Sequence, residues 1–133
     1  HDALPIWRNG IHNITTKIID NKFIKKNKEK FDRVLIDAPC SGFGVIRRNP
    51  DSKWKLNRKD FNRILNNQIN ILNNYSKLVS DNGIMVYVTC SIFPSENEKQ
   101  IALFLNNEFG KNFKIIEEKN SILNWFKIWS EYR

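Results

Sequence analysis

Apolar and polar residues alternate along the chain in blocks that predict strands and helices in turn. The β-branched run 14–19 predicts a strand that ends at Asp20, and a second strand is predicted over 31–36. Pro39 follows the second strand and cannot take part in a central ladder, so the strand stops before it. The polar, Lys-rich segment 21–30 between the two predicts a loop with room for one helical turn.

A helix and a buried strand are predicted in the middle of the chain. Asn57 is a suitable N-cap, and apolar residues recur at helical spacing from there to Val79, with Gly83 as the predicted stop. The run 84–89 is apolar and β-branched, as expected for a strand buried on both faces.

The last part of the chain predicts two more helices and a strand. Ser95 and Glu98 have the spacing of a capping box, which predicts a helix from there to about Phe109. A strand is predicted over 113–116. The tail 121–133 carries two tryptophans at an i, i+4 spacing, which indicates a short amphipathic helix.

Strands that alternate with helices predict an α/β domain with a mostly parallel sheet and flanking helices. In such sheets, ligands bind beyond the carboxyl ends of the strands. Asp20, Asp37 and Cys90 lie at predicted carboxyl ends, and Cys40 lies just beyond one. These four residues therefore mark a candidate site.

Length and charge add little to this prediction. The chain has 133 residues, enough for one domain with a modest core. It has neither an apolar run of membrane-spanning length nor the pattern of a signal peptide, so no membrane association and a cytoplasmic location are expected. The net charge of +8 favours a polyanionic partner such as RNA, although basic composition alone is weak evidence.

The two cysteines are fifty positions apart, which indicates neither a metal cluster nor a secreted disulfide framework. No metal is expected. A free cysteine is usually an inert core residue, so the neighbouring residues have to decide whether Cys40 and Cys90 have a chemical role.

Those neighbours form four segments in a fixed order: 37–42 (DAPCSG), 44–54 (GVIRRNPDSKW), 89–91 (TCS) and 94–98 (PSENE). Together they resemble the Sun-type (RsmB-like) RNA 5-methylcytosine methyltransferases, and the resemblance covers roughly residues 11–118. It implies a Rossmann-like methyltransferase fold, S-adenosylmethionine as cofactor and RNA, most naturally small-subunit ribosomal RNA, as substrate.

The resemblance also implies roles for single residues. Carbon-5 of cytosine is a poor nucleophile, and a thiolate that adds to carbon-6 activates it. Cys90 matches the family's nucleophile, and Cys40 matches the cysteine that assists release of the product. Asp37 would contact the cytosine edge or the cofactor, and Asp20 would lie near the adenosine of the cofactor. We therefore expect the two sulfurs to converge.

The basic segment after Cys40 is the candidate RNA contact. Arg47, Arg48 and Lys53 would bind phosphates and position the RNA without reading its sequence. Trp54 could stack on a base. The target base must leave any stack to reach the thiols.

The chain departs from the family pattern near both ends. Only Gly10 precedes Asp20, so the glycine-rich cofactor loop would lie upstream of residue 1. The family's closing Gly-Phe-Phe-type strand is also not recognisable. Residues 1–133 are therefore interpreted as a partial catalytic domain, apparently truncated at both ends.

Two other functions are alternatives to the methyltransferase. A non-catalytic RNA-binding domain would keep the basic segment, and its thiols would be relics. A cysteine hydrolase would need a base near the thiol, and neither His1 nor His12 lies in a motif that would place it there. Asp20 and Asp37 could also be ordinary cap or turn residues, and Arg47 and Arg48 a solvated surface pair.

Overall fold

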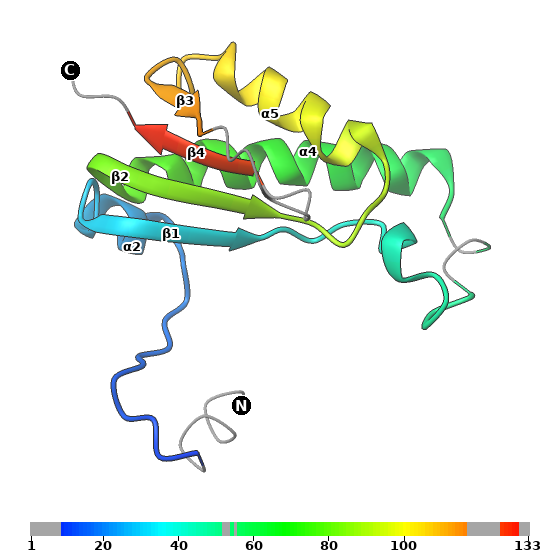
Figure 1. Ribbon diagram of the computed structural model, residues 1–133, viewed down its shortest axis with the longest axis horizontal. Coiled ribbons are helices and arrows are strands. Elements are labelled where there is room, and N and C mark those ends of the chain that lie inside the picture. Colours follow the sequence, from blue (N-terminus) through cyan, green and yellow to red (C-terminus); the bar gives the residue numbers. More distant parts are fainter. Residues whose placement is uncertain (1–8, 52–53, 55, 117–125, 131–133) are drawn as a thin grey trace.

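The computed structural model describes residues 9–51, 54, 56–116 and 126–130, the last segment as backbone only. These residues form a four-stranded sheet in the order β1-β2-β4-β3 (Figure 1). The strands are β1 (Phe31–Asp37), β2 (Val79–Val88), β3 (Phe113–Ile115) and β4 (Phe126–Ser130). Pairing is parallel between β1 and β2 and antiparallel on both sides of β4. Three of the four strands thus run in one direction, which confirms the mostly parallel α/β sheet.

Two helices cover one face of this sheet (Figure 1). They are α4 (Arg58–Tyr75) and α5 (Glu98–Leu105), and a third helix, α2 (Asn21–Lys26), precedes β1. Leu72 of α4 and Phe104 of α5 are fully buried against Met85 and Tyr87 of β2. On the opposite face, Leu35 of β1 is 68% exposed. No described helix is long and apolar enough to cross a membrane.

The register of the two central strands brings their carboxyl ends to the same level. Asp37 is paired with Val88 at the last position of each strand, and the Ala38 N–H donates to the Val88 carbonyl at 2.9 Å. The loops that carry Cys40 and Cys90 therefore leave the sheet side by side, at the edge where parallel α/β sheets bind ligands.

The predicted strand over 14–19 does not form. These residues have no regular secondary structure and lie outside the described sheet, and their isoleucines are exposed, Ile18 to 86%. A β-branched run favours a strand only where it has a partner and a surface to pack on. Asp20 is accordingly no strand end: its Oδ1 accepts the Phe23 N–H at 2.7 Å and caps α2, the helical turn allowed for in segment 21–30.

The helix predicted from Asn57 begins as expected but ends earlier. The Asn57 side chain caps α4 by accepting the Asp60 N–H at 2.9 Å. The α-helix ends at Tyr75, and a short 3-10 turn (η2, Ser76–Leu78) follows it. Val79 already belongs to β2, where it pairs with Phe31.

Gly83 is therefore part of an irregular stretch of β2 and is not a helix stop. The register with β1 shifts between residues 31 and 33, and Asn82 adopts a positive φ of 60°. A Cβ at Gly83 would lie 2.7 Å from Val79 Cγ1, so the chain folds back on itself too closely for any side chain there.

The capping box predicted for Ser95 and Glu98 was also wrong. A 3-10 turn (η3, Pro94–Glu96) contains Ser95, and α5 begins only at Glu98. The side chains of Glu96 and Asn97 bind the cysteine loops instead, as described below. This extra turn delays the helix, which then ends at Leu105, before the predicted Phe109.

The predicted tail helix was replaced by a strand. The strand predicted over 113–116 forms as β3, and β4 lies between β2 and β3 with backbone pairing on both sides. Two full ladders outweigh the weak helical period of a tryptophan pair. The remaining residues of that predicted helix, 121–125 and 131–133, lie outside the described residues.

Candidate active site

The two cysteines meet at the carboxyl edge of the sheet. Cys40 Sγ lies 3.1 Å from Cys90 Sγ, although the residues are fifty positions apart. Cys40 is on the loop after β1, and Cys90 follows β2 by two residues. The expected convergence of the sulfurs is confirmed.

Their environments differ. Cys90 is exposed and Cys40 is half-buried. Burial, together with the hydrogen bond to Cys90, raises the pKa of the Cys40 thiol to about 11. Cys40 therefore keeps its proton at neutral pH, whereas the exposed Cys90 is the thiol that an approaching reactant would meet first.

A glycine-rich turn joins the Cys40 loop to the Cys90 backbone. Gly42 has a φ of +74°, and the turn continues as η1 (Phe43–Val45). The Gly44 N–H donates to the Cys90 carbonyl at 2.8 Å, and a Cβ on Gly44 would lie 2.6 Å from that oxygen. Only glycine permits this approach, because the two backbones are in direct contact.

A buried carboxylate joins the same loops from the other side. Glu96 is completely buried. Its Oε1 accepts hydrogen bonds from the Ser41 N–H at 2.8 Å and from Gln68 Nε2 at 3.0 Å. Its Oε2 accepts from Ser41 Oγ at 2.5 Å and from Ser91 Oγ. We call these four residues the Glu96 network.

The Glu96 backbone is held as well. Its carbonyl accepts the hydroxyl of Tyr87 at 2.9 Å. Burial, and then the nearby Glu96 and Cys40, raise the pKa of Tyr87 well above its usual value, so this hydroxyl stays a donor. A residue of the central strand thus fixes the turn that carries the carboxylate.

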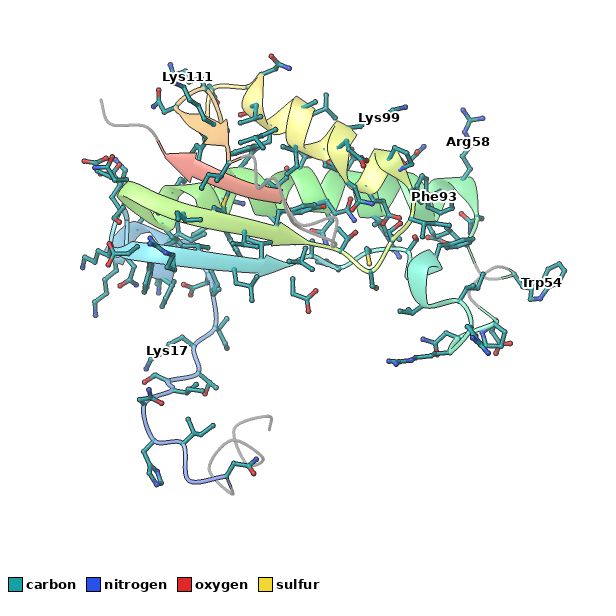
Figure 2. The ribbon with its side chains drawn as sticks, viewed as in Figure 1. Lys17, Trp54, Arg58, Phe93, Lys99 and Lys111 are labelled. Atoms are coloured by element: carbon teal, nitrogen blue, oxygen red, sulfur yellow. The ribbon has the colours of Figure 1, made fainter. Side chains whose placement is uncertain are left out.

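Asn97 stabilises the loop after Cys90. Its Nδ2 donates to the carbonyls of Ser91 and Phe93, both at 3.0 Å, and its Oδ1 accepts from Thr89 Oγ1 at 2.6 Å. Three aromatic rings pack beside this loop. The ring of Phe93 (labelled in Figure 2) lies 4.8 Å from that of Phe43 and 5.5 Å from that of Phe61 of α4.

The two predicted cofactor residues, Asp37 and Asp20, lie in different kinds of position. Asp37 is the last residue of β1 and is exposed at the carboxyl edge, three positions before Cys40. Asp20 is occupied as the cap of α2. Their cofactor roles stay predictions, and only Asp37 has the predicted place at a strand end.

The candidate RNA residues lie beyond η1. Arg47 and Arg48 are exposed, and Trp54 is 80% exposed. Figure 2 shows Trp54 pointing away from the body of the protein, at the same end as Arg58 of α4. Lys53 lies outside the described residues.

The sequence interpretation missed the Glu96 network. The local pattern predicts a capping box of Ser95 and Glu98 and indicates no role for Glu96 between them. A signal was present, because Ser41 and Ser91 each directly follow a cysteine. What the sequence could not indicate is that one carboxylate accepts from both.

Comparison with known proteins agrees with this geometry. The chain is 49% identical over 77 residues to the ribosomal RNA small subunit methyltransferase B of Enterobacter sp. (strain 638), a stretch of 58% of this chain and 18% of that relative. The crystal structure of PH0851 superimposes with a TM-score of 0.78 at 30% identity, covering 96% of this chain and 33% of that one.

A third comparison shows the fold alone. The crystal structure of NSun6 from Pyrococcus horikoshii with SFG superimposes with a TM-score of 0.71 at 21% identity, covering 93% of this chain and 35% of that one.

The family described as 16S rRNA methyltransferase RsmB/F matches residues 4–124, nearly the whole chain. With its Rossmann-like fold, this chain belongs to the RsmB/F methyltransferase family.

Proposed function

We propose that the protein containing this chain transfers a methyl group from S-adenosylmethionine to carbon-5 of a cytosine in RNA, with small-subunit ribosomal RNA as substrate. The chain spans 18% of the curated relative described above, so this activity is proposed for the longest natural chain that contains it. The observation that carries the proposal is the 3.1 Å separation of the two thiol sulfurs at the carboxyl edge of the sheet.

Cys90 is assigned as the nucleophile because it is the exposed thiol of the pair. Its thiolate adds to carbon-6 of the cytosine, forming a carbon–sulfur bond and placing an electron pair at carbon-5. This addition converts an unreactive ring carbon into a nucleophile, which is the purpose of covalent catalysis.

Cys40 is assigned to product release. The methylated adduct must lose its carbon-5 proton and re-form the ring double bond, and the electrons of the carbon–sulfur bond return to Cys90. Cys40 donates its proton to the leaving Cys90 sulfur, and the Cys40 thiolate left by that transfer accepts the carbon-5 proton. Cys40 is the group placed within 3.1 Å of the leaving sulfur. Its raised pKa keeps it protonated in the resting protein, so it does not compete with Cys90 as nucleophile.

The described residues can bind the adenosine part of the cofactor. The Asp37 carboxylate is exposed at the carboxyl edge and can accept hydrogen bonds from an adenine amino group or a ribose hydroxyl. Asp20 is the weaker candidate, because its Oδ1 is used in capping α2. When bound, S-adenosylmethionine supplies an electrophilic methyl group; the solved structure of NSun6 with SFG, an analogue of this cofactor, has the same fold.

The exposed Arg47 and Arg48 are assigned to RNA phosphates and Trp54 to base stacking. Lys53 is included by its position in the sequence. All four follow the Cys40 loop, so RNA bound there would lead directly to the thiols.

The test uses a Cys40→Ala variant of the longest natural chain, mixed with unmodified small-subunit ribosomal RNA and S-adenosylmethionine. Without the release residue, we expect a protein–RNA adduct that survives denaturing electrophoresis. The adduct should disappear when Cys90 is also changed to Ala. The wild-type protein should instead turn over and leave 5-methylcytosine in the RNA.

A different result would favour the second function. If RNA binds but neither an adduct nor methylated RNA is detected, the protein is a non-catalytic RNA-binding domain. The net charge of +8 and the exposed arginines are the observations that would then remain.

A further inference from the structure

Glu96 is an unusual residue to find at the centre of this fold. It has no exposed surface, and the donors that the structure shows for its carboxylate are uncharged. Burying a carboxylate is unfavourable unless its hydrogen bonds compensate, and an apolar side chain often stabilises a core better. Stability alone is therefore a poor reason for a carboxylate at this position.

The partners of Glu96 indicate another reason. Ser41 directly follows Cys40, and Ser91 directly follows Cys90. Both hydroxyls donate to the same carboxylate oxygen, and they lie 3.2 Å from each other. One side chain therefore connects the two cysteine loops.

Gln68 of α4 shows that the Glu96 network has a cost in stability. Its Nε2 binds both Glu96 and, at 3.0 Å, the Pro39 carbonyl just before Cys40. Its Oε1 is buried and has no partner among the described residues. An unsatisfied buried polar atom is tolerated where the geometry of its neighbours matters more than stability.

We infer that Glu96 is a positioning residue that sets the separation of the Cys40 and Cys90 sulfurs; this inference rests on the function proposed above. The carboxylate makes two bonds to Ser41 and one to Ser91. The Cys90 loop keeps further bonds from Asn97 when Glu96 is changed. Loss of the network therefore displaces Cys40 more than Cys90, and it impairs release more than attack.

The first experiment measures sulfur proximity directly and needs no RNA. Diamide takes up two protons and two electrons from a thiol pair as the disulfide forms. We compare its rate of Cys40–Cys90 disulfide formation in Glu96→Gln and Glu98→Gln variants of the longest natural chain. Glu98 is exposed on the first turn of α5, so the control makes the same change in charge two positions away.

Glutamine at position 96 presents one NH₂ group to hydrogen-bond donors, whichever way its amide is turned. Losing a hydrogen bond to a charged acceptor has consequences on the order of 10-fold or more. We therefore expect cross-linking in Glu96→Gln to be about 10-fold slower than in Glu98→Gln. Equal rates in the two variants would overturn the inference.

The second experiment measures the release step. In Glu96→Gln with RNA and S-adenosylmethionine, the denaturant-stable adduct should accumulate, as in Cys40→Ala, while turnover falls about 10-fold. A purely structural defect would lower adduct and turnover together, and that result would also contradict a positioning role. If wild-type protein makes no methylated RNA and Cys40→Ala no adduct, the proposed function fails, and the cross-linking rates still decide the role of Glu96.

Ser41→Ala and Ser91→Ala provide a second route should Glu96→Gln fold poorly, as judged by its thermal unfolding. Each removes one hydroxyl donor to Glu96 and leaves the carboxylate in place. The double variant should slow cross-linking to the rate predicted for Glu96→Gln. A double variant that cross-links at the wild-type rate would show that the network does not position the sulfurs.

Discussion

The loops of Cys40 and Cys90 reach the same point with different kinds of support. Cys90 follows the central strand β2 almost at once, and its loop is held by Asn97. Cys40 lies three residues beyond β1, and its loop depends on contacts from elsewhere: Gln68, Gly44 and the Glu96 network. One thiol is exposed and the other half-buried.

This difference matches the two chemical tasks proposed for the cysteines. A nucleophile must be open to its substrate and rigidly placed, which the end of a central strand provides. A residue that acts only after an adduct has formed benefits from being shielded and protonated until then. Two identical side chains can therefore have separate roles because their surroundings differ.

The largest effect should come from alkylation of the two thiols. The pKa of Cys40 is raised from 9.0 to about 11, so at pH 8 its thiolate fraction falls about 100-fold. We expect iodoacetamide to modify Cys90 first and Cys40 on the order of 10 to 100 times more slowly. Cys40 should become reactive only as the pH rises through about 9 towards 11. Mass spectrometry of digested protein measures the alkylation rate of each cysteine. Equal rates for Cys40 and Cys90 at pH 8 would contradict the raised pKa of Cys40.

A smaller effect is expected at the contact between the loops. Gly44→Ala puts a methyl group 2.6 Å from the Cys90 carbonyl oxygen, so the loops must separate. We expect a loss of about 1–3 kcal/mol in stability and a roughly 10-fold lower adduct yield in the Cys40→Ala background. Gly10→Ala is the control for a loss of stability away from the thiols, because its φ of 71° strains an alanine there although nothing lies within 4 Å of the added Cβ. An unchanged adduct yield in Gly44→Ala would show that this contact does not matter for attack.

The smallest effect should come from the segment that extends the Cys40 loop. Changing Arg47 and Arg48 to Ala should weaken RNA binding several-fold and reduce the salt dependence by about two phosphate contacts. Changing the exposed Lys25 and Lys26 of α2 removes the same charge elsewhere and serves as the control. Fluorescence titration with RNA at several salt concentrations compares the affinity of the Arg47 and Arg48 variant with that of the Lys25 and Lys26 variant. Equal losses would mean that charge alone, without a defined RNA site, accounts for binding.

The sequence predicts most of the elements whose formation depends on a local pattern of residues. The strand before Cys40, the Asn57 cap and the strand before Cys90 are confirmed, because buried periodicity and capping chemistry act over a few residues. The pairing of the two cysteines came from a family resemblance, since no local pattern could relate positions fifty apart.

The wrong predictions concern segments whose structure depends on contacts with distant parts of the chain. The run 14–19 has the composition of a strand but lies outside the described sheet. The tail residues 126–130 have ladders on both sides, which the tryptophan spacing could not reveal. At Ser95, a local capping pattern was overridden because Glu96 and Asn97 bind loops that belong to other parts of the chain.

The Glu96 network also links reactivity to folding. Ser41 and Glu96 are 55 residues apart in the chain, and Gln68 and Glu96 are 28 apart, so the network closes only when three separate segments have docked. Contacts of such long sequence separation form late, because loop closure costs entropy before it brings any gain. A nascent or partly folded chain would therefore carry two ordinary, separated cysteines. The paired thiols would arise only in the finished protein. Under the proposed function, this order of assembly would spare RNA from covalent attachment to molecules that could not release it.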